Sequence, residues 1–506
     1  MRSYFIILFL LITLIPGKTQ GYYNGLYEYS NHGTLTPKAI VINDTIIVSG
    51  ATRDLNDLSK WCIFMMRLDT FGQIIDSSRI CDPNSGTLIG SEVWSDLKPT
   101  SDSGFILTAA EFESYDGVFV KVDKNLDLEI FQEYPDSISS VEFYSETIEL
   151  DIGYLLGGTV QRPNALLDGF IRKTNLDGTS IYHEFLGDLD KDEALIDFIL
   201  RNDTIIGVGY HQLITGDEFS NRPWVIYLDL DGNVLHEKRE SEDVGFFSIN
   251  RISPLSNGEW VFVGRMKCQN FQGNDAYCTG VGTLDANFNL ISISPVGFAE
   301  PYTSFLHSLS PAINNSDFIA SGKSKVPNNS GSGPPVLHSG WIVRFTETGD
   351  TLWSNTFIPP TNTPANEGYF SGAGELSSGS IIAVGTARLG IDYYYWLVKM
   401  SPDGCIDTIN CISLSNNVLG VIDQQSYLKV YPNPADSQIE ITLSSTNNSG
   451  HKIHITSIDG RIMHSEDANS NLTINSSSWS EGMYIIHAFD PHGKYISKKL
   501  VVFHKD

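Results

Sequence analysis

A repeated strand–turn motif is the feature that most constrains this chain. The motif occurs seven times, as FMMRLDTFGQI, VFVKVDKNLDL, FIRKTNLDGTS, WVIYLDLDGNV, GVGTLDANFNL, WIVRFTETGDT and WLVKMSPDGCI. Its turns start at Asp69, Asp123, Asn175, Asp229, Asp285, Thr346 and Ser401, which lie 54, 52, 54, 56, 61 and 55 residues apart. A period this regular indicates that one structural unit is repeated.

Each repeat contains four short strands. An apolar strand that usually ends in glycine precedes the motif, as in TIIVSG, GYLLGG and IIAVG. Another strand comes before it, as in KAIVI, and a fourth follows the turn, as in VLHEKRE. Four-stranded units repeated seven times predict an all-β fold, a seven-bladed β-propeller over residues 22–412, whereas a stacked solenoid has much shorter coils. We expect residues 22–30 to supply the outer strand of the last blade, because ring closure removes exposed sheet edges. The recurring glycines indicate close packing or a bend, not phosphate binding.

Length and charge restrict the partners. With 506 residues, the chain exceeds what one hydrophobic core usually spans, so two or more modules are expected. Its 60 acidic and 33 basic residues give a net charge of -27, which repels phosphate backbones and predicts no nucleic-acid partner. Residues 427–506 hold 8 acidic and 7 basic residues, which leaves 52 and 26, a net of -26, for the part before them. Nearly all the acidity therefore belongs to the repeats.

The N-terminal segment MRSYFIILFLLITLIPGKTQG has the pattern of a secretory signal peptide over residues 1–21. Arg2 precedes an apolar run over residues 5–15, and a Pro-Gly pair ends it. The run is too short to span a bilayer, so we predict no membrane span, although a membrane anchor is the alternative.

Export would place the six cysteines in an oxidising environment. Their spacing predicts three local disulfides, Cys62–Cys81, Cys268–Cys278 and Cys405–Cys411, the first pair lying symmetrically about the turn DTFG. No CxxC occurs, which argues against a zinc site.

Two acidic patterns raise the question of calcium. Turns such as DLDGNV at 229–234 have carboxylates at alternate positions, but hairpin turns require Asp, Asn and Gly for backbone reasons, which we take as the explanation. The loop GDLDKDEA also alternates, with Asp188, Asp190 and Asp192, yet Glu193 and Ile199 occupy the positions of the glycine and the closing glutamate of an EF-hand. We therefore predict no cofactor, with calcium as the open alternative.

The last eighty residues differ from the repeats. Short alternating strands with turns at Asn-Pro, Asp-Gly and His-Gly predict a small antiparallel β-sandwich. Four motifs follow one another there: a YPNP opening, a DGR turn, a GMY strand and a basic, aliphatic last strand. They comprise Tyr431, Pro432, Asn433 and Pro434; Asp459, Gly460 and Arg461; Gly482, Met483 and Tyr484; and Lys498 and Lys499 in the last strand.

These motifs resemble the type A C-terminal sorting domain of the type IX secretion system of the Bacteroidota. The resemblance covers residues 427–506, with 413–426 as a linker, and implies recognition by the outer-membrane secretion machinery. It also implies a secreted or surface-attached protein, usually with removal of the tail. An ordinary carbohydrate-binding or adhesion sandwich is the alternative.

The activity of the repeats stays open, because no HExxH, GxSxG, P-loop or strand-linked GxGxxG occurs. The absence favours a non-catalytic binding or adhesion module for glycan or protein ligands; a secreted polysaccharide hydrolase or lyase is the alternative. The long loops are expected on one face, where ligands tend to bind. The candidate segments are 210–224, 323–341 and 357–370, with Trp224, Trp341, Tyr369 and Tyr394 as sugar-stacking platforms. Alternatively, and more in keeping with average burial, these aromatic rings pack between blades.

Overall fold

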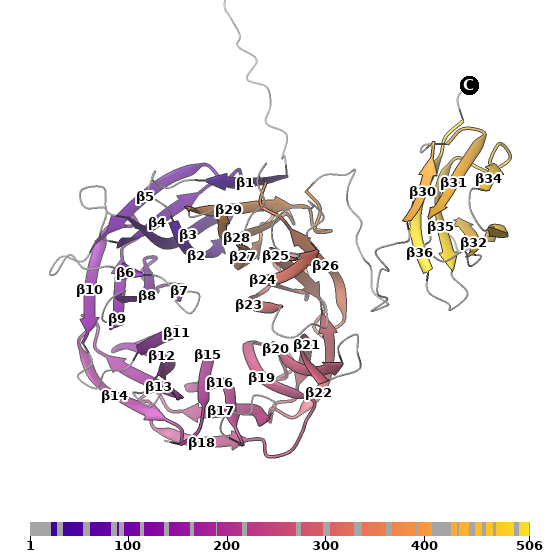
Figure 1. The fold of residues 1–506 in the computed structure, drawn as a ribbon. Helices are drawn as coiled ribbons and strands as arrows, with labels where there is room; N and C mark the ends of the chain where they lie inside the picture. The colour runs from indigo at the N-terminus through magenta and orange to yellow at the C-terminus, as the bar shows by residue number, and fades with distance from the viewer. Residues whose placement is uncertain are drawn as a thin grey trace, which may run out of the picture. The chain divides into compact units, whose positions relative to one another are not determined.

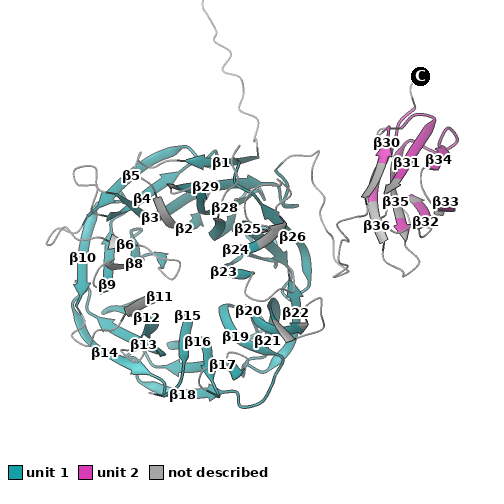
Figure 2. Ribbon diagram, in the orientation of Figure 1, with its two compact units in different colours: residues 1–416 teal, residues 417–506 magenta. Residues whose placement is uncertain are grey.

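The chain divides into two compact units, residues 1–416 and 417–506 (Figure 2). The computed structural model describes residues 22–27, 34–53, 61–81, 89–90, 96–111, 116–135, 141–161, 166–188, 190–214, 220–269, 275–296, 304–327, 336–360, 367–389 and 392–406 of the first unit, and 427–432, 435–444, 451–457, 462–468, 472–489 and 495–504 of the second. The predicted signal peptide and linker lie outside these residues. Within the described part of the chain, no helix is long and apolar enough to cross a membrane.

The first unit is a ring of seven antiparallel sheets, which confirms the seven-bladed propeller (Figure 1). In each blade the first strand lies nearest the axis and the last lies at the rim (Figure 1). The first three blades consist of β2 (Thr34–Ile42), β3 (Thr45–Arg53), β4 (Trp61–Leu68) and β5 (Ile74–Ile80); β6 (Ile89–Gly90), β7 (Leu97–Pro99), β8 (Phe105–Glu111), β9 (Gly117–Val122) and β10 (Leu128–Tyr134); and β11 (Val141–Leu150), β12 (Gly153–Gln161), β13 (Leu167–Thr174) and β14 (Ser180–Leu186).

Blades four to six repeat the same order of strands. They consist of β15 (Glu193–Arg201), β16 (Thr204–Gln212), β17 (Asn221–Leu228) and β18 (Val234–Arg239); β19 (Phe246–Pro254), β20 (Trp260–Gln269), β21 (Asp275–Leu284) and β22 (Leu290–Val296); and β23 (Phe305–Pro311), β24 (Phe318–Pro327), β25 (Val336–Phe345) and β26 (Thr351–Phe357).

The seventh blade closes the ring with a strand from the start of the unit. Its sheet runs β27 (Glu367–Glu375), β28 (Ile381–Leu389), β29 (Asp392–Met400) and β1 (Tyr23–Tyr27). β1 pairs antiparallel with β29, from Tyr23 opposite Lys399 to Tyr27 opposite Tyr395, which confirms the predicted closure. The Trp396 indole Nε1 donates a hydrogen bond to Asn24 Oδ1 at 2.6 Å, so a fully buried ring also holds the closing strand.

Replacing Asn24 with alanine should lower the free energy of unfolding by about 1–3 kcal/mol, because the buried indole N–H of Trp396 loses its acceptor. Urea denaturation followed by tryptophan fluorescence measures the change. Ser77→Ala on the rim strand β5, where the side chain is exposed, is the control and should change stability little. Equal stability of the two variants would show that this hydrogen bond contributes nothing to closure.

The recurring glycines are explained by packing inside each blade. Five of them face a large aromatic residue on the third strand, in the pairs Gly50–Phe64, Gly158–Phe170, Gly209–Trp224, Gly322–Trp341 and Gly385–Trp396. Next to several of them the first strand has a bulge, which turns a carbonyl oxygen toward the glycine. A Cβ on Gly322 would lie 1.7 Å from the Phe305 oxygen, and one on Gly209 would lie 1.8 Å from the Ala194 oxygen. The prediction of close packing is confirmed.

The Asp-Gly turns serve the backbone, as expected from turn chemistry. In blade four, Asp229 Oδ1 accepts hydrogen bonds from the backbone N–H groups of Asp231 (2.9 Å) and Asn233 (2.8 Å). Gly232 follows with φ of 87°, a conformation that favours glycine. Asp69, Asp123 and Asp285 accept the same pair of backbone hydrogen bonds, although Leu126 and Phe288 take the place of the glycine in the last two turns. In the turn DLDGNV, the Asp229 carboxylate therefore has its partners within its own turn, and the Asp231 carboxylate pairs with Lys173 of blade three at 2.5 Å.

The second unit is a small antiparallel sandwich. One sheet has the order β30 (Tyr427–Tyr431), β31 (Gln438–Ser444) and β34 (Leu472–Asn475), and the other β33 (Ile462–Ala468), β32 (His451–Ser457), β35 (Gly482–Phe489) and β36 (Tyr495–Val502). Its buried residues include Ile441, Ile455, Tyr484 and Leu500, which form one core within the unit. The sandwich prediction is confirmed.

Candidate functional site

Two of the predicted stacking residues are buried. Trp224 on β17 and Trp341 on β25 keep 0% and 1% of their surface exposed. The Trp224 Nε1 donates to Glu237 Oε1 at 2.6 Å, and that of Trp341 to Ser354 Oγ at 2.8 Å. A ring without exposed surface cannot stack on a sugar, so the alternative of packing between blades describes both. In the strand register, Trp224 is opposite Gly209 and Trp341 is opposite Gly322, and both rings belong to hydrophobic cores of the propeller.

The other two aromatic candidates are half-buried. Tyr369 starts the inner strand β27, and Tyr394 lies in β29. The ring of Tyr369 is 6.2 Å from that of His307 in the neighbouring blade. Parts of the three candidate loops, residues 215–219, 328–335 and 361–366, lie outside the described residues. Sugar stacking by Tyr369 and Tyr394 stays a prediction.

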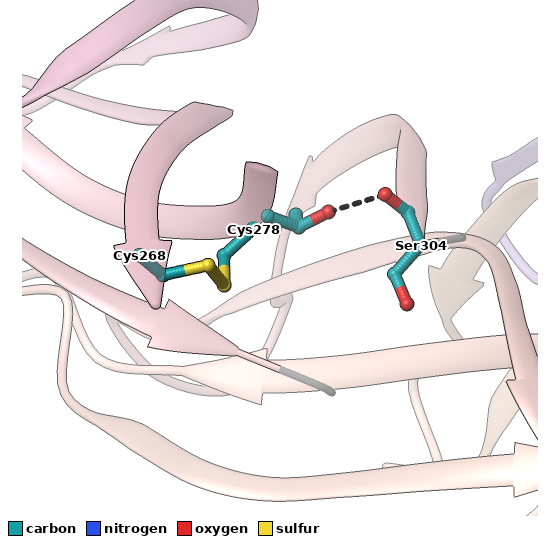
Figure 3. The surroundings of a disulfide bond; sticks show 4 residues. Cys268, Cys278 and Ser304 are labelled. Atoms are coloured by element: carbon teal, nitrogen blue, oxygen red, sulfur yellow. Dashed lines mark hydrogen bonds between the residues drawn. A yellow bond between two sulfur atoms is a disulfide. The ribbon is translucent and has the colours of Figure 1, made fainter. Parts of the chain in front are cut away.

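Two predicted disulfides are present. Cys62 and Cys81 are joined across β4 and the end of β5, and Cys268 and Cys278 across β20 and β21. Figure 3 shows the second bridge beside Ser304, whose carbonyl oxygen accepts a hydrogen bond from Thr279 Oγ1 at 2.7 Å. The bridge thus lies where blade five contacts the start of blade six. For the third predicted pair, Cys411 lies outside the described residues.

Charged side chains gather at the axis of the ring, where sequence reasoning placed none. They lie on or beside the inner strands of blades one to six; Figure 1 shows that these strands surround the centre of the ring. We call them the axial cluster: Lys38, Asp96, Lys98, Glu146, Asp197, Arg251 and His307. Lys38 of blade one interacts electrostatically with Arg251 of blade five, and Lys98 of blade two with Asp197 of blade four. Blades that are not neighbours can approach one another in this way only at the axis.

Hydrogen bonds fix the acidic members of the axial cluster. Asp96 Oδ2 accepts from the Thr147 backbone N–H at 2.7 Å, which links blade two to blade three. Asp197 Oδ2 accepts from the Ile252 backbone N–H at 2.9 Å, which links blade four to blade five. Glu146 forms an ion pair with Lys98. Each carboxylate thus holds an inner strand or a neighbouring charge in place, which makes the site rigid.

The surroundings shift the pKa values of several cluster residues. Burial and the nearby Asp96 raise the pKa of Glu146, although Lys98 opposes the shift. Burial also raises the pKa of Asp197, against the effect of Arg251. For Lys98, burial is outweighed by the carboxylates of Glu146, Asp96 and Asp197, so its pKa is raised and it stays protonated. Lys98 keeps 42% of its side-chain surface exposed, so water reaches this part of the axis.

Lys38 is the exception within the axial cluster. It is 8% exposed, and it has no hydrogen-bond or ion-pair partner among the residues that the structure describes. Burial and the repulsion by Arg251 lower its pKa from 10.5 to about 7, although the carboxylates of Asp96 and Glu146 act in the opposite direction. His307 is affected in the same way: burial, Lys38, Lys323 and Arg251 hold its pKa well below the usual value, so it is neutral. The cations Lys38, Lys323 and Arg251 therefore gather on the side of the axis formed by blades five, six and one.

The sequence contains a signal for this cluster. Lys38, Glu146, Asp197 and Arg251 occupy corresponding positions, each just past a bulge in an inner strand. A charged residue that recurs inside a buried strand of successive repeats is unusual and marks the axis. Their proximity across non-neighbouring blades could not be read from spacing.

In the acidic loop at 187–194, three of the acidic side chains have partners that hold the loop in place. Asp188 pairs with Lys191 at 2.6 Å, Glu193 pairs with Arg239, and Asp192 Oδ1 accepts from the Leu167 backbone N–H at 3.0 Å. Among the residues that the structure describes, no group of three or more His, Cys, Asp or Glu side chains could hold a metal ion.

Residues 429–503 match the family model described as "Secretion system C-terminal sorting domain". This confirms the resemblance seen in the sequence motifs. In the structure Tyr484 is buried and its hydroxyl donates to the Ser480 oxygen at 2.7 Å, whereas Tyr431 and Lys498 are exposed. The Tyr431–Pro432 peptide bond is cis. Asn433, Pro434 and the Asp459–Gly460–Arg461 turn lie outside the described residues.

No curated protein matches the chain. Among solved structures, the polysaccharide lyase Uly1 is 9% identical, with 78% of this chain and 94% of that chain covered and a TM-score of 0.40. A puromycin hydrolase is 10% identical, with coverages of 89% and 58% and a TM-score of 0.41. Drosophila Plexin A in complex with Semaphorin 1b is 10% identical, with coverages of 76% and 87% and a TM-score of 0.39. Structural similarity at this level does not indicate the function of this chain.

Proposed function

We propose that this protein, which carries a type IX secretion sorting domain at residues 429–503, is an exported binding module whose propeller holds a glycan or protein ligand at its axis. The sorting domain indicates secretion, with release or attachment at the outer-membrane surface, and interaction with the type IX secretion machinery. The single observation that supports the binding role is the axial cluster, in which charged groups from six blades meet on a rigid scaffold.

The state of the carboxylates favours binding over catalysis. Glycoside hydrolysis requires a pair of carboxyl groups that are free to exchange protons and attack or activate water. Asp96 and Asp197 instead accept backbone hydrogen bonds that join neighbouring blades, and Glu146 is paired with Lys98. A polysaccharide hydrolase or lyase is therefore the second candidate. Tyr369 and Tyr394 are the aromatic residues that we propose for sugar stacking, since both keep exposed surface.

A glycan and protein panel tests the proposal with the purified full-length chain. Binding to immobilised glycans or cell-surface proteins is measured with and without EDTA, and the same glycans are incubated and assayed for new reducing ends and unsaturated products. We expect binding without cleavage and without a requirement for calcium. Cleavage products would establish the enzymatic alternative, and loss of binding in EDTA would indicate a calcium site.

A further inference from the structure

The two sides of the axial cluster differ in charge. On blades two to four, the carboxylates of Asp96, Glu146 and Asp197 surround Lys98, so positive charge is compensated there. On blades five, six and one, the charged groups that shift the pKa of His307 are all cations, namely Lys38, Lys323 and Arg251. Arg251 donates its hydrogen bonds to the carbonyl oxygens of Ile196 (2.8 Å) and Asn250 (2.7 Å), which are neutral acceptors. No carboxylate therefore compensates this side by direct contact among the described residues.

Lys38 carries the strongest indication that a ligand belongs here. A buried ammonium group is costly unless an anion or several acceptors surround it. Lys38 is more than nine-tenths buried and forms no hydrogen bond or ion pair within the part of the chain that the structure describes, and the carboxylates of Asp96 and Glu146 offset its burial and the repulsion by Arg251 only in part. It lies on the inner strand β2 and interacts with Arg251 across the axis, so it faces the same space as His307. A bound anion would supply the missing counter-ion.

The chemistry of the surroundings restricts the kind of anion. The repeats have a net charge of -26, which repels long polyanions and leaves only a local site for a single acidic group. The carboxylates across the axis can accept hydrogen bonds from hydroxyl groups, and neutral His307 offers one donor and one acceptor. Tyr369 places an aromatic ring beside His307. Cation, acceptors and aromatic ring together suit a polyhydroxylated acid.

We propose that Lys38 and Arg251, with His307 beside them, bind the carboxylate of an acidic saccharide of the uronate class at the propeller axis. This inference rests on the binding role proposed above and specifies its ligand. The ammonium group of Lys38 is the direct counter-ion, and the carboxylates across the axis accept from the sugar hydroxyls. Binding of the anion favours protonated Lys38, so complex formation takes up a proton near neutral pH.

The test compares a matched pair of ligands by titration calorimetry on the full-length chain at pH 6.5. A trisaccharide with one terminal galacturonate and no other acidic group is expected to bind at least tenfold more tightly than its carboxyl-reduced, neutral counterpart. Lys38→Met should remove this preference, reducing affinity for the acidic trisaccharide at least tenfold. Lys124→Met is the control, because it removes the same charge from an exposed turn of blade two, and it should bind like the native protein.

Stability gives a second, independent readout for Lys38→Met. Because the pKa of Lys38 falls to about 7 in the folded chain, its burial opposes folding most strongly below pH 7, and the penalty fades as the pH rises toward 10.5. The variant should therefore melt at a higher temperature than the native protein at pH 6, with a smaller difference at pH 9. A gain in stability combined with a loss of binding is typical of a residue kept for function.

The pH dependence of binding has several contributors. Lys98, Arg251, His307, Asp96 and Glu146 also face Lys38, and protonation of the carboxylates at low pH would favour anions as well. Native affinity for the acidic trisaccharide should fall between pH 6 and pH 8.5. The fall should be smaller in Lys38→Met, and an unchanged profile in that variant would contradict the role of Lys38.

The outcomes separate this inference from the general binding role. Preference for neutral glycans or for proteins would overturn the uronate assignment and leave the binding role in place. Equal affinity for inorganic sulfate, or for a carboxylate-bearing peptide, would overturn the saccharide part. Cleavage of every bound glycan would overturn the binding role, and unchanged affinity in Lys38→Met would overturn the site.

Discussion

Removal of residues 427–506 is expected to abolish display at the cell surface and to leave a folded propeller in the periplasm. The second unit has its own core, with Ile441, Ile455, Tyr484 and Leu500 buried within it, and the propeller closes through β1 and β29 without it. Modules with separate cores fold independently, so the truncation removes the targeting domain without removing support for the propeller fold. Cell fractionation and surface proteolysis measure the location, and circular dichroism of the recovered protein measures the fold.

Two controls make this experiment decisive. A reporter fused to residues 413–506, behind the predicted signal peptide at residues 1–21, should reach the surface if the sorting domain at residues 429–503 is sufficient for export. A smaller deletion, residues 495–506, removes β36 with Leu500 and Val502 from the core and should fail to sort like the full truncation. Mass spectrometry of the exported native protein should find cleavage within residues 413–426. Normal surface display of the truncated chain would refute the sorting role.

Gly322→Ala is expected to be the most damaging single substitution in the propeller. The new Cβ would lie 1.7 Å from the Phe305 carbonyl oxygen and 2.8 Å from the Leu306 Cα, both backbone atoms that cannot rotate away. The inner strand β23 would have to move, and with it the packing of blade six. Overpacking of this kind costs about 3 kcal/mol or more, a large share of the stability of a domain. The propeller transition in urea, followed by tryptophan fluorescence, measures the loss.

Gly258→Ala separates steric clash from backbone strain. Gly258 has φ of 95°, and the nearest atom to a new Cβ is Arg201 Nη2 at 4.0 Å, so only the conformational cost remains. That cost is about 1–2 kcal/mol. If Gly322→Ala is no more destabilising than Gly258→Ala, the contact with the inner-strand bulge is not the reason for the recurring glycines.

The sequence alone determined the elements that depend on local chemistry. The strand–turn period defined seven blades, because Asp, Asn and Gly at fixed positions satisfy the backbone of each turn, as Asp229 and Gly232 do. The cysteine spacings predicted Cys62–Cys81 and Cys268–Cys278 because both pairs span a single hairpin. The sorting domain was identified from short motifs whose order along the chain is itself the signal.

Only the tertiary structure decided which side chains are exposed and which meet at the axis. Trp224 and Trp341 looked like binding residues because their loops are long, yet each ring is buried in the core of the propeller, opposite a glycine on the neighbouring strand. Lys38 and Arg251 are more than two hundred positions apart and belong to blades that are not neighbours, so no local pattern links them. Ring closure by β1 brings the inner strands around one axis. The burial of Lys38 at this axis is a property of the closed ring and has no counterpart in the local sequence.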